Sequence, residues 1–98
     1  MILGIRDPNQ GKETVDSIKN ELSSANVQII LHKLDLSSIE SIHYFANLVL
    51  ETESHIDVLI NNAGLIATTK RITVDGFETN LAVNHLGHFL LTLLFLER

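Results

Sequence analysis

Three polar sets follow apolar runs of strand-like length, and their residue types suit ligand binding. They are Arg6-Asp7, Asp35-Leu36 and Asn61-Asn62-Ala63-Gly64. A carboxylate such as that of Asp35 only accepts hydrogen bonds, whereas the guanidinium of Arg6 pairs with phosphate through parallel charge-assisted bonds. A glycine at position 64 lets the backbone approach a ligand that any Cβ would obstruct. The three sets are therefore the first candidates for a binding site.

Each set also has an ordinary structural interpretation when taken alone. Asp35 can be a strand-exit or helix-capping residue, since Asp is common at caps. The tetrapeptide at 61–64 can be a plain turn, and Arg6 can be a solvated loop cation. The surrounding elements must decide between these interpretations.

Three short apolar runs predict strands over residues 1–5, 27–34 and 57–60, the second of them rich in β-branched residues. Each set of candidate residues follows one of these runs. A first helix is predicted from Lys12 until Asn26, because apolar residues recur at intervals of three and four: Val15, Ile18, Leu22 and Ala25.

Two further helices follow the second and third strands. Ser37-Ser38-Ile39-Glu40 matches a capping box in which Ser37 accepts from the amide of Glu40. Thr73 and Asp75 offer caps for the last helix, whose residues 81–96 are apolar nearly all round and are expected to be mostly buried. Asn84 lies in this apolar helix, where a buried amide needs partners.

The alternation of strands and helices predicts an α/β fold, a partial doubly wound parallel sheet with three strands, three helices and right-handed crossovers. Ligands of such sheets bind beyond the carboxyl ends of the strands. We therefore expect Arg6, Asp35 and the segment from Asn61 to Gly64 to meet at one edge. No linker-like stretch divides the 98 residues into domains.

Composition excludes several other classes of function. The net charge of −5 without a basic cluster argues against nucleic acid as a partner. No cysteine is present, so no disulfide or zinc-thiolate site is expected. His85 and His88 are three apart on a helix but lack a third ligand, and no metal site is predicted. No apolar stretch approaches the roughly 20 residues of a membrane span, and the first residues do not resemble a signal peptide.

The chain resembles the short-chain dehydrogenase/reductase family, most closely its retinol-dehydrogenase-like branch. The resemblance covers essentially all of the sequence. Its marks stand in the family's order and approximate spacing: Leu34-Asp35-Leu36, Asn61-Asn62-Ala63-Gly64, Gly76-Phe77-Glu78 and Val83-Asn84-His85-Leu86-Gly87-His88-Phe89.

The resemblance implies roles for individual residues. Asp35, with Leu36 beside it, corresponds to the family's acceptor for the adenine amino group. Asn62-Ala63-Gly64 corresponds to the backbone that passes the cofactor's ribose, and Asn61 would tie its strand to its neighbours. Asn84 matches the active-site asparagine, which holds a water in the proton relay behind a catalytic tyrosine and lysine.

Arg6 lies where the family discriminates between its two cofactors. A guanidinium there favours the 2′-phosphate of NADP(H), with NAD(H) the weaker alternative. Asp7 next to it can either fold back onto Arg6 or compete for the ribose.

Several parts of the family pattern have no counterpart here. No glycine-rich loop precedes the first strand, and Gly4, Gly11 and Lys12 lack the spacing of a phosphate loop. The catalytic serine and Tyr-x-x-x-Lys are not found: Tyr44 has Leu48 in the lysine position and is expected to be a packing residue. The resemblance thus implies a partial dinucleotide-binding domain over residues 1–98, without the first βα unit and the catalytic C-terminal part.

The resulting hypothesis is a fragment of an NADP(H)-dependent oxidoreductase acting on an alcohol or carbonyl substrate, for which the resemblance suggests a retinoid or other lipid-like molecule. The alternative is a non-catalytic truncated product that binds another protein through its last helix. That helix can equally be core or a face between two copies of the chain. A flavodoxin-like phosphoacceptor is disfavoured because Asp57 lies at the start of its strand.

Overall fold

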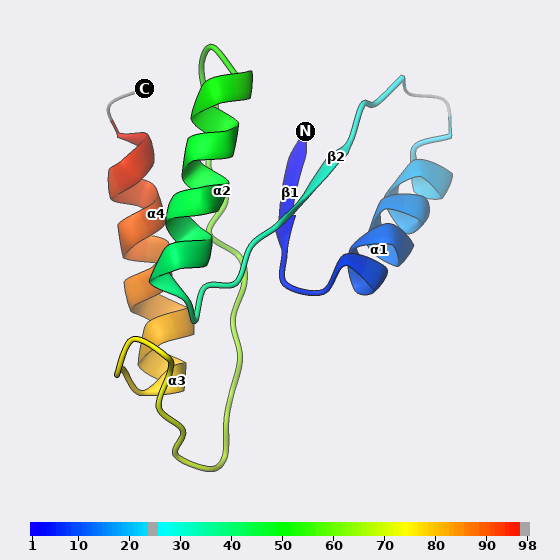
Figure 1. The fold of residues 1–98 in the computed structure, drawn as a ribbon. Coiled ribbons are helices and arrows are strands. Elements are labelled where there is room, and N and C mark those ends of the chain that lie inside the picture. Colours follow the sequence, from blue (N-terminus) through cyan, green and yellow to red (C-terminus); the bar gives the residue numbers. More distant parts are fainter. Residues whose placement is uncertain (24–25, 97–98) are drawn as a thin grey trace. The chain divides into compact units, whose positions relative to one another are not determined.

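The computed structural model describes residues 1–23 and 26–96 and has an α/β fold with two compact units, residues 1–34 and 35–98. The first unit contains β1 (Ile2–Ile5), α1 (Pro8–Glu21) and β2 (Ile30–Lys33). The second contains four helical elements, labelled along the chain in Figure 1 except for η1: α2 (Ile39–Thr52), α3 (Thr79–Leu81), the π-helix η1 (Ala82–Leu86) and α4 (Gly87–Phe95).

The first unit is a βαβ arrangement, as the sequence predicts. β1 and β2 are parallel, with Ile2 opposite Ile30 and Ile5 opposite Lys33. The ladder covers only part of the predicted strand at 27–34, because β1 offers four residues for pairing. Two further backbone bonds extend the ladder, from Ile30 N to Met1 O at 2.9 Å and from Leu34 N to Ile5 O at 3.0 Å, and the second closes its carboxyl end.

α1 begins four residues before the predicted start at Lys12. Asp7 is its N-cap, accepting from the Asn9 amide at 2.9 Å, and Pro8 occupies the first turn, where its fixed φ suits a helix. Pro8 therefore belongs to the helix. The Asp7 carboxylate caps the helix instead of folding back onto Arg6.

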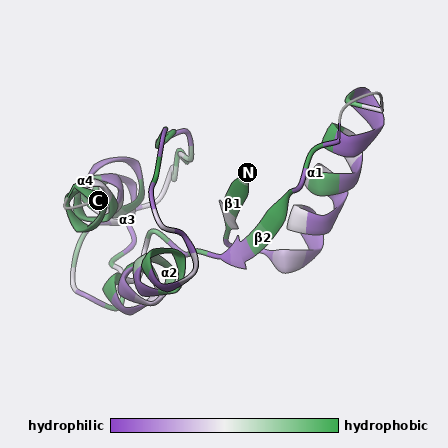
Figure 2. Cartoon of the chain, turned by 90° about the horizontal axis from the view of Figure 1, so that it is seen from above, coloured by the Kyte–Doolittle hydropathy of each residue, from purple (hydrophilic) through white to green (hydrophobic). Residues whose placement is uncertain are grey.

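α1 ends at Glu21, earlier than the predicted stop at Asn26, and Leu22 is 43% exposed. The last residue of the predicted stripe, Ala25, lies outside the described residues. Many residues of α1 are hydrophilic (Figure 2). Its close contact with β2 is made at Gly11, where a Cβ would lie 2.7 Å from the side chain of Leu31.

The core of the second unit lies between α2 and the helical run from α3 to α4. Ile42, Phe45 and Val49 of α2 are buried, as are Leu91 and Phe95 of α4. The rings of Phe45 and Phe95 meet edge to face, with centroids 6.4 Å apart. Tyr44 is 68% exposed, so the prediction that it packs is wrong.

The N-terminus of α2 is capped one residue later than predicted. Ser38 is the N-cap, accepting from the Ser41 amide at 3.2 Å, and Asp75 accepts from the Ile39 amide at 2.8 Å. Ser37 is not available as a cap because its amide and hydroxyl both donate to Asp35. The predicted capping box from Ser37 to Glu40 does not form.

The last helical run is capped by Glu78, not by Thr73 or Asp75. The Glu78 carboxylate accepts from the amides of Leu81 and Asn80, and these two bonds lower the pKa of its carboxyl group. Thr73 instead accepts from the Phe77 amide in the preceding turn. Asp75 is occupied by α2, which explains why neither residue serves the later helix.

The predicted strand over residues 57–60 is not a strand in the structure. Among the described residues the sheet has only β1 and β2, so this apolar run has no ladder partner. Val58 is 74% exposed and Ile60 is 78% exposed. A strand requires a neighbour for its backbone groups, and the apolar pattern alone does not supply one.

The expectation that residues 81–96 are mostly buried is also wrong. Leu91 and Phe95 are buried, but Phe89 is 57% exposed and Leu96 is 70% exposed. Within this unit the helix packs against α2 on one side, which leaves its outer face uncovered. Across the described residues, no helix is both long and apolar enough to cross a membrane.

Candidate functional site

An extended segment, residues 61–67, runs antiparallel to α3, η1 and α4 and is joined to them by regularly spaced hydrogen bonds. Figure 1 shows it in yellow-green, before the chain enters α3. Four helical residues spaced four apart bind segment residues spaced two apart. The pairs are Asn80 with Ala67, Asn84 with Leu65, His88 with Ala63, and Thr92 with Asn61.

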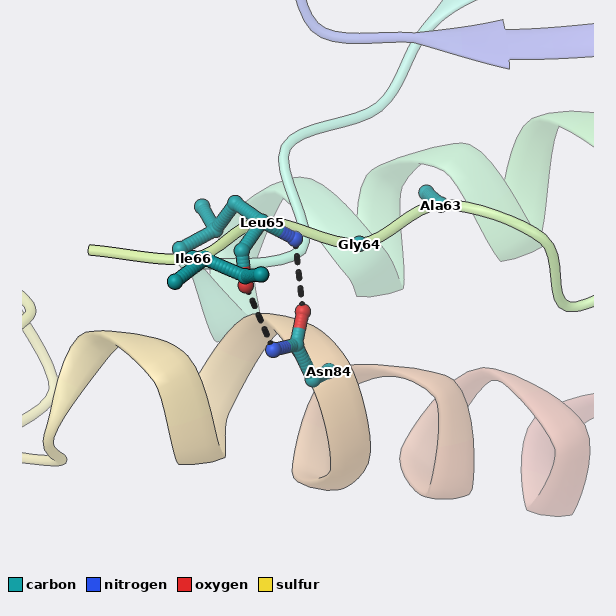
Figure 3. Close-up of a pocket in the computed structure, with 5 residues that line it drawn as sticks. All are labelled: Ala63, Gly64, Leu65, Ile66 and Asn84. Carbon is teal, nitrogen blue, oxygen red and sulfur yellow. Dashed lines mark hydrogen bonds between the residues drawn. The ribbon is translucent and has the colours of Figure 1, made fainter.

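Two asparagines hold the segment as a neighbouring strand would. Asn84 Oδ1 accepts from Leu65 N at 2.8 Å, and Asn84 Nδ2 donates to Leu65 O at 2.7 Å (Figure 3). Asn80 makes the same two bonds with Ala67, at 2.8 and 3.1 Å. Paired residues of an antiparallel ladder exchange N–H and C=O bonds in this way. The side-chain amides therefore replace a strand partner.

The other two pairs use different chemistry. His88 Nε2 lies 2.6 Å from Ala63 O, and a carbonyl only accepts, so this nitrogen carries the proton. Thr92 Oγ1 accepts from Asn61 Nδ2 at 3.0 Å and donates to His88 O at 2.8 Å. Asn61 thus ties the segment to α4.

The π turn of η1 brings these four helical side chains closer to one face of the helix. Four residues of an α-helix rotate by about 400°, so three such steps would carry the last side chain about 120° around the helix. In η1 the amide of Gly87 bonds to Ala82 O, five residues back. This wider turn contains more residues than an α-helical turn, so each residue rotates less and the drift of the last side chain around the helix is smaller. Lengths also match, because four helical residues rise about 6.0 Å and two extended residues about 6.7 Å.

The structure brings together four of the predicted site residues: Asn62, Ala63, Gly64 and Asn84. The first three are exposed, and Gly64 and Ala63 line an open hollow with Leu65, Ile66 and Asn84. Asn84 is exposed rather than buried, although it has the partners that the sequence argument required. Backbone groups of an extended chain alternate in direction, and those of Ala63 and Leu65 face the helix. Those of Asn62 and Gly64 therefore face away from it.

Two glycines of this region differ in what the fold requires. A Cβ on Gly87 would lie 2.6 Å from Leu36 O, so the contact of η1 and α4 with the chain before α2 excludes a side chain there. A Cβ on Gly64 would meet only Asn84 Oδ1, at 3.4 Å, which is ordinary contact. The fold needs glycine at position 87 but not at position 64.

Asp35 and Leu36 lie at the start of the second unit. Asp35 is half-buried, and its Oδ1 accepts from Ser37 N at 2.9 Å and from Ser37 Oγ at 2.6 Å. Both of these bonds are made by Oδ1 and not by Oδ2. The Leu36 side chain is buried in the core, so only its backbone remains for a ligand.

Arg6 follows β1 in the first unit and is exposed. It forms no ion pair with any described residue. Because Arg6 and Asp35 belong to different units, their meeting at one edge stays a prediction.

The sequence analysis missed Asn80, His88 and Thr92 as partners of the segment. The signal is visible as polar residues at four-residue intervals along an apolar helix. His85 does not share a site with His88, since its ring stacks on Phe89 with centroids 6.3 Å apart. No group of three or more His, Asp or Glu residues among those described is placed to hold a metal ion.

Comparison with known proteins identifies the family of this chain. The sequence model of the short chain dehydrogenases matches residues 3–98. The chain belongs to the short-chain dehydrogenase family. Members of this family are oxidoreductases that use nicotinamide dinucleotides. The resemblance seen in the sequence motifs is therefore confirmed.

The curated relatives include several retinol dehydrogenases. Human retinol dehydrogenase 12 is 46% identical over 96 residues, which are 98% of this chain and 30% of the relative. Human retinol dehydrogenase 13 is 42% identical over 98 residues, the whole chain and 29% of the relative. The chain thus spans about a third of the length of the curated relatives it matches.

A solved structure supports the fold. The crystal structure of an uncharacterized protein from Mycobacterium paratuberculosis superimposes with a TM-score of 0.79 at 39% identity. The match covers 99% of this chain and 32% of that one. The predicted α/β class, a partial doubly wound fold, is confirmed.

Proposed function

We propose that the chain is part of the dinucleotide-binding domain of an NADP(H)-dependent oxidoreductase that interconverts an alcohol and a carbonyl compound. The proposal rests on the arrangement of the segment from Asn62 to Gly64. Side chains of the helix hold its inner edge, and the backbone groups of Asn62 and Gly64 face outward beside an open hollow. The retinol dehydrogenases among the relatives favour a retinoid or similar lipid-like substrate.

The residues present fit a dinucleotide. Gly64 has room for a Cβ within the protein, so a close ligand explains its lack of a side chain better than the fold does. Ser37 fixes the Asp35 carboxylate through Oδ1, which leaves Oδ2 to accept from the adenine amino group. The Leu36 backbone lies next to it, and Arg6 would pair with the 2′-phosphate of NADP(H).

The role of Asn84 follows from its bonds. Both ends of its amide are engaged by Leu65, so a relay water would be held at the main chain and not at the side chain. In η1 the backbone hydrogen bonds join residues five apart and not four apart, which interrupts the regular pairing of main-chain carbonyls and amides. We expect a main-chain carbonyl of this turn to accept from that water. When bound, the nicotinamide supplies or receives the hydride.

The unpaired apolar run at residues 57–60 supports a larger domain. Its exposed side chains and lack of a ladder partner suit a central strand of a doubly wound sheet. We propose that residues 1–98 form only part of that domain. A first βα unit with a glycine-rich loop would pair with this run, and a Tyr-x-x-x-Lys pair would perform the acid-base chemistry.

The exposed apolar face of α4 supports pairing between two copies of the chain. Phe89, Leu93 and Leu96 are 57%, 46% and 70% exposed. Sedimentation of the full-length protein and of Phe89→Glu tests this: a dimer that the variant converts to a monomer supports it, and an unchanged monomer contradicts it.

Titration of the full-length protein with NADPH and with NADH, followed by calorimetry, tests the function. We expect saturable binding of both, with NADPH the tighter ligand. Absence of binding to either at millimolar concentration would contradict the proposal and favour a non-catalytic interaction module.

A further inference from the structure

We infer that His88 is a positioning residue that sets where the Asn62-Ala63-Gly64 backbone stands relative to the helix, and so sets the affinity for the dinucleotide. The inference rests on the proposed function, because it assumes that this tripeptide contacts the cofactor. It goes further by assigning a role to a side chain that hydrogen-bonds to the backbone of the tripeptide.

His88 contacts the segment at a different place from the two asparagines. Asn80 and Asn84 bind both backbone groups of Ala67 and Leu65, at one end of the segment. His88 makes a single bond, from Nε2 to Ala63 O at 2.6 Å. Ala63 is the middle residue of the tripeptide, so this bond acts where the backbone would meet the ligand.

The choice of histidine is not explained by packing. Nδ1 of His88 is buried and has no hydrogen-bond partner among the described residues. A buried nitrogen without a partner opposes stability, and an aliphatic side chain of similar size would avoid that cost. The ring is therefore best explained by what its other nitrogen does at Ala63.

The length of the side chain also matters. An imidazole places its Nε2 farther from the main chain than an asparagine places its amide nitrogen. Histidine at position 88 thus holds Ala63 farther from the helix than asparagine would hold it. Glutamine has an amide donor at a more similar reach, whereas asparagine has the donor without the reach.

Three variants of the full-length protein separate these properties: His88→Leu removes the donor, His88→Asn shortens it and His88→Gln approximates its reach. His85→Leu is the matched control, since His85 lies on the same helical run, stacks on Phe89 and makes none of the hydrogen bonds that join the helix to the described segment. Calorimetric titration with NADPH gives the affinity. Turnover at saturating NADPH and thermal unfolding are measured in parallel.

We expect His88→Leu to weaken NADPH binding about five- to tenfold, the effect of one lost hydrogen bond, while kcat at saturation changes less than twofold. His88→Asn should fall in the same range, and His88→Gln and His85→Leu should stay within about twofold of the parent. If His88→Leu does not fold, the comparison of His88→Asn with His88→Gln decides. Equal affinity for all His88 variants, or equal loss in His85→Leu, would overturn the inference.

Hydrogen exchange without dinucleotide separates this inference from the proposed function. The amides of Leu65 and Ala67 are hydrogen-bonded to Asn84 and Asn80, so their exchange rates report how firmly the segment is bound to the helix. Faster exchange of residues 61–67 in His88→Leu, but not in His85→Leu, supports positioning even if no variant binds NADPH. Unchanged exchange in His88→Leu would overturn it even if the parent protein binds NADPH.

Discussion

Asn84 exchanges two hydrogen bonds with Leu65, at 2.8 and 2.7 Å, and so fills the place that a neighbouring strand residue would take. The repeat of this pattern at Asn80 and Ala67 makes it a ladder between a helix and an extended segment. One edge of the segment is thereby fixed without a sheet. Its other edge, at Asn62 and Gly64, is where we propose that the cofactor binds.

Substituting Asn84 by Asp tests the ladder. A carboxylate cannot donate to Leu65 O, so the variant loses one bond and brings two acceptors together. We expect a loss of about 1 kcal/mol in the free energy of unfolding, measured with urea at pH 7. Asn80→Asp should behave alike, whereas unchanged stability in both variants would show that the ladder does not stabilise the unit.

Gly87→Ala tests the close contact in the second unit. The new methyl group would lie 2.6 Å from Leu36 O and 3.0 Å from Ala82 O, both of which belong to the backbone and cannot rotate away. We expect a loss of about 1 to 3 kcal/mol in unfolding free energy, the range for overpacking. Thermal unfolding of the variant at or above the parent's Tm would contradict this account.

Arg6→Ala tests the choice of cofactor. Removing the guanidinium should weaken NADPH binding about tenfold or more, because a charge-assisted bond is lost, and should leave NADH binding nearly unchanged. Lys12→Ala is the control, since it removes the same charge from α1. Equal losses for the two cofactors in Arg6→Ala, or the same selectivity in Lys12→Ala, would refute the assignment of Arg6.

Glu78 should make stability depend on pH. Bonds from the amides of Leu81 and Asn80 favour its ionised form and lower its pKa from the ordinary value of 4.5. Such a group stabilises the fold above its unfolded pKa, and the contribution is lost as pH falls through the lower folded pKa. The Tm difference between the parent and Glu78→Gln should therefore be largest near pH 7, shrink as pH falls below 4.5 and vanish below the lowered pKa of the folded state. A difference that is constant from pH 3 to pH 7 would be inconsistent with this role.

The sequence predicts those features that depend on local pattern. The apolar runs predict β1, β2 and their parallel pairing, and the Ser-x-x-Glu motif at residues 37–40 predicts a helix where α2 begins. The tetrapeptide from Asn61 to Gly64 identifies the segment on which the proposed site depends. These features need no knowledge of distant residues.

Features that depend on competing or distant partners were not predictable in this way. Ser37 fails as a cap because Asp35 engages it, and Asp75 is used by α2 instead of the helix that follows it. The run at 57–60 is apolar like a strand, but a ladder depends on a partner that local pattern cannot supply. Likewise the four-residue spacing from Asn80 to Thr92 indicates a row of hydrogen bonds only once the extended segment, with its two-residue spacing, is known to lie beside the helix.

The most direct test of the central claim is the affinity of Gly64→Ala for NADPH. The fold has room for this methyl group, whose nearest neighbour would be Asn84 Oδ1 at 3.4 Å, so the Tm should stay close to that of the parent protein. If the backbone at position 64 contacts the dinucleotide, the methyl group must weaken NADPH binding, by about tenfold or more for a loss of 1.4 kcal/mol. Unchanged NADPH affinity in a folded Gly64→Ala protein would show that this segment is not where the cofactor binds.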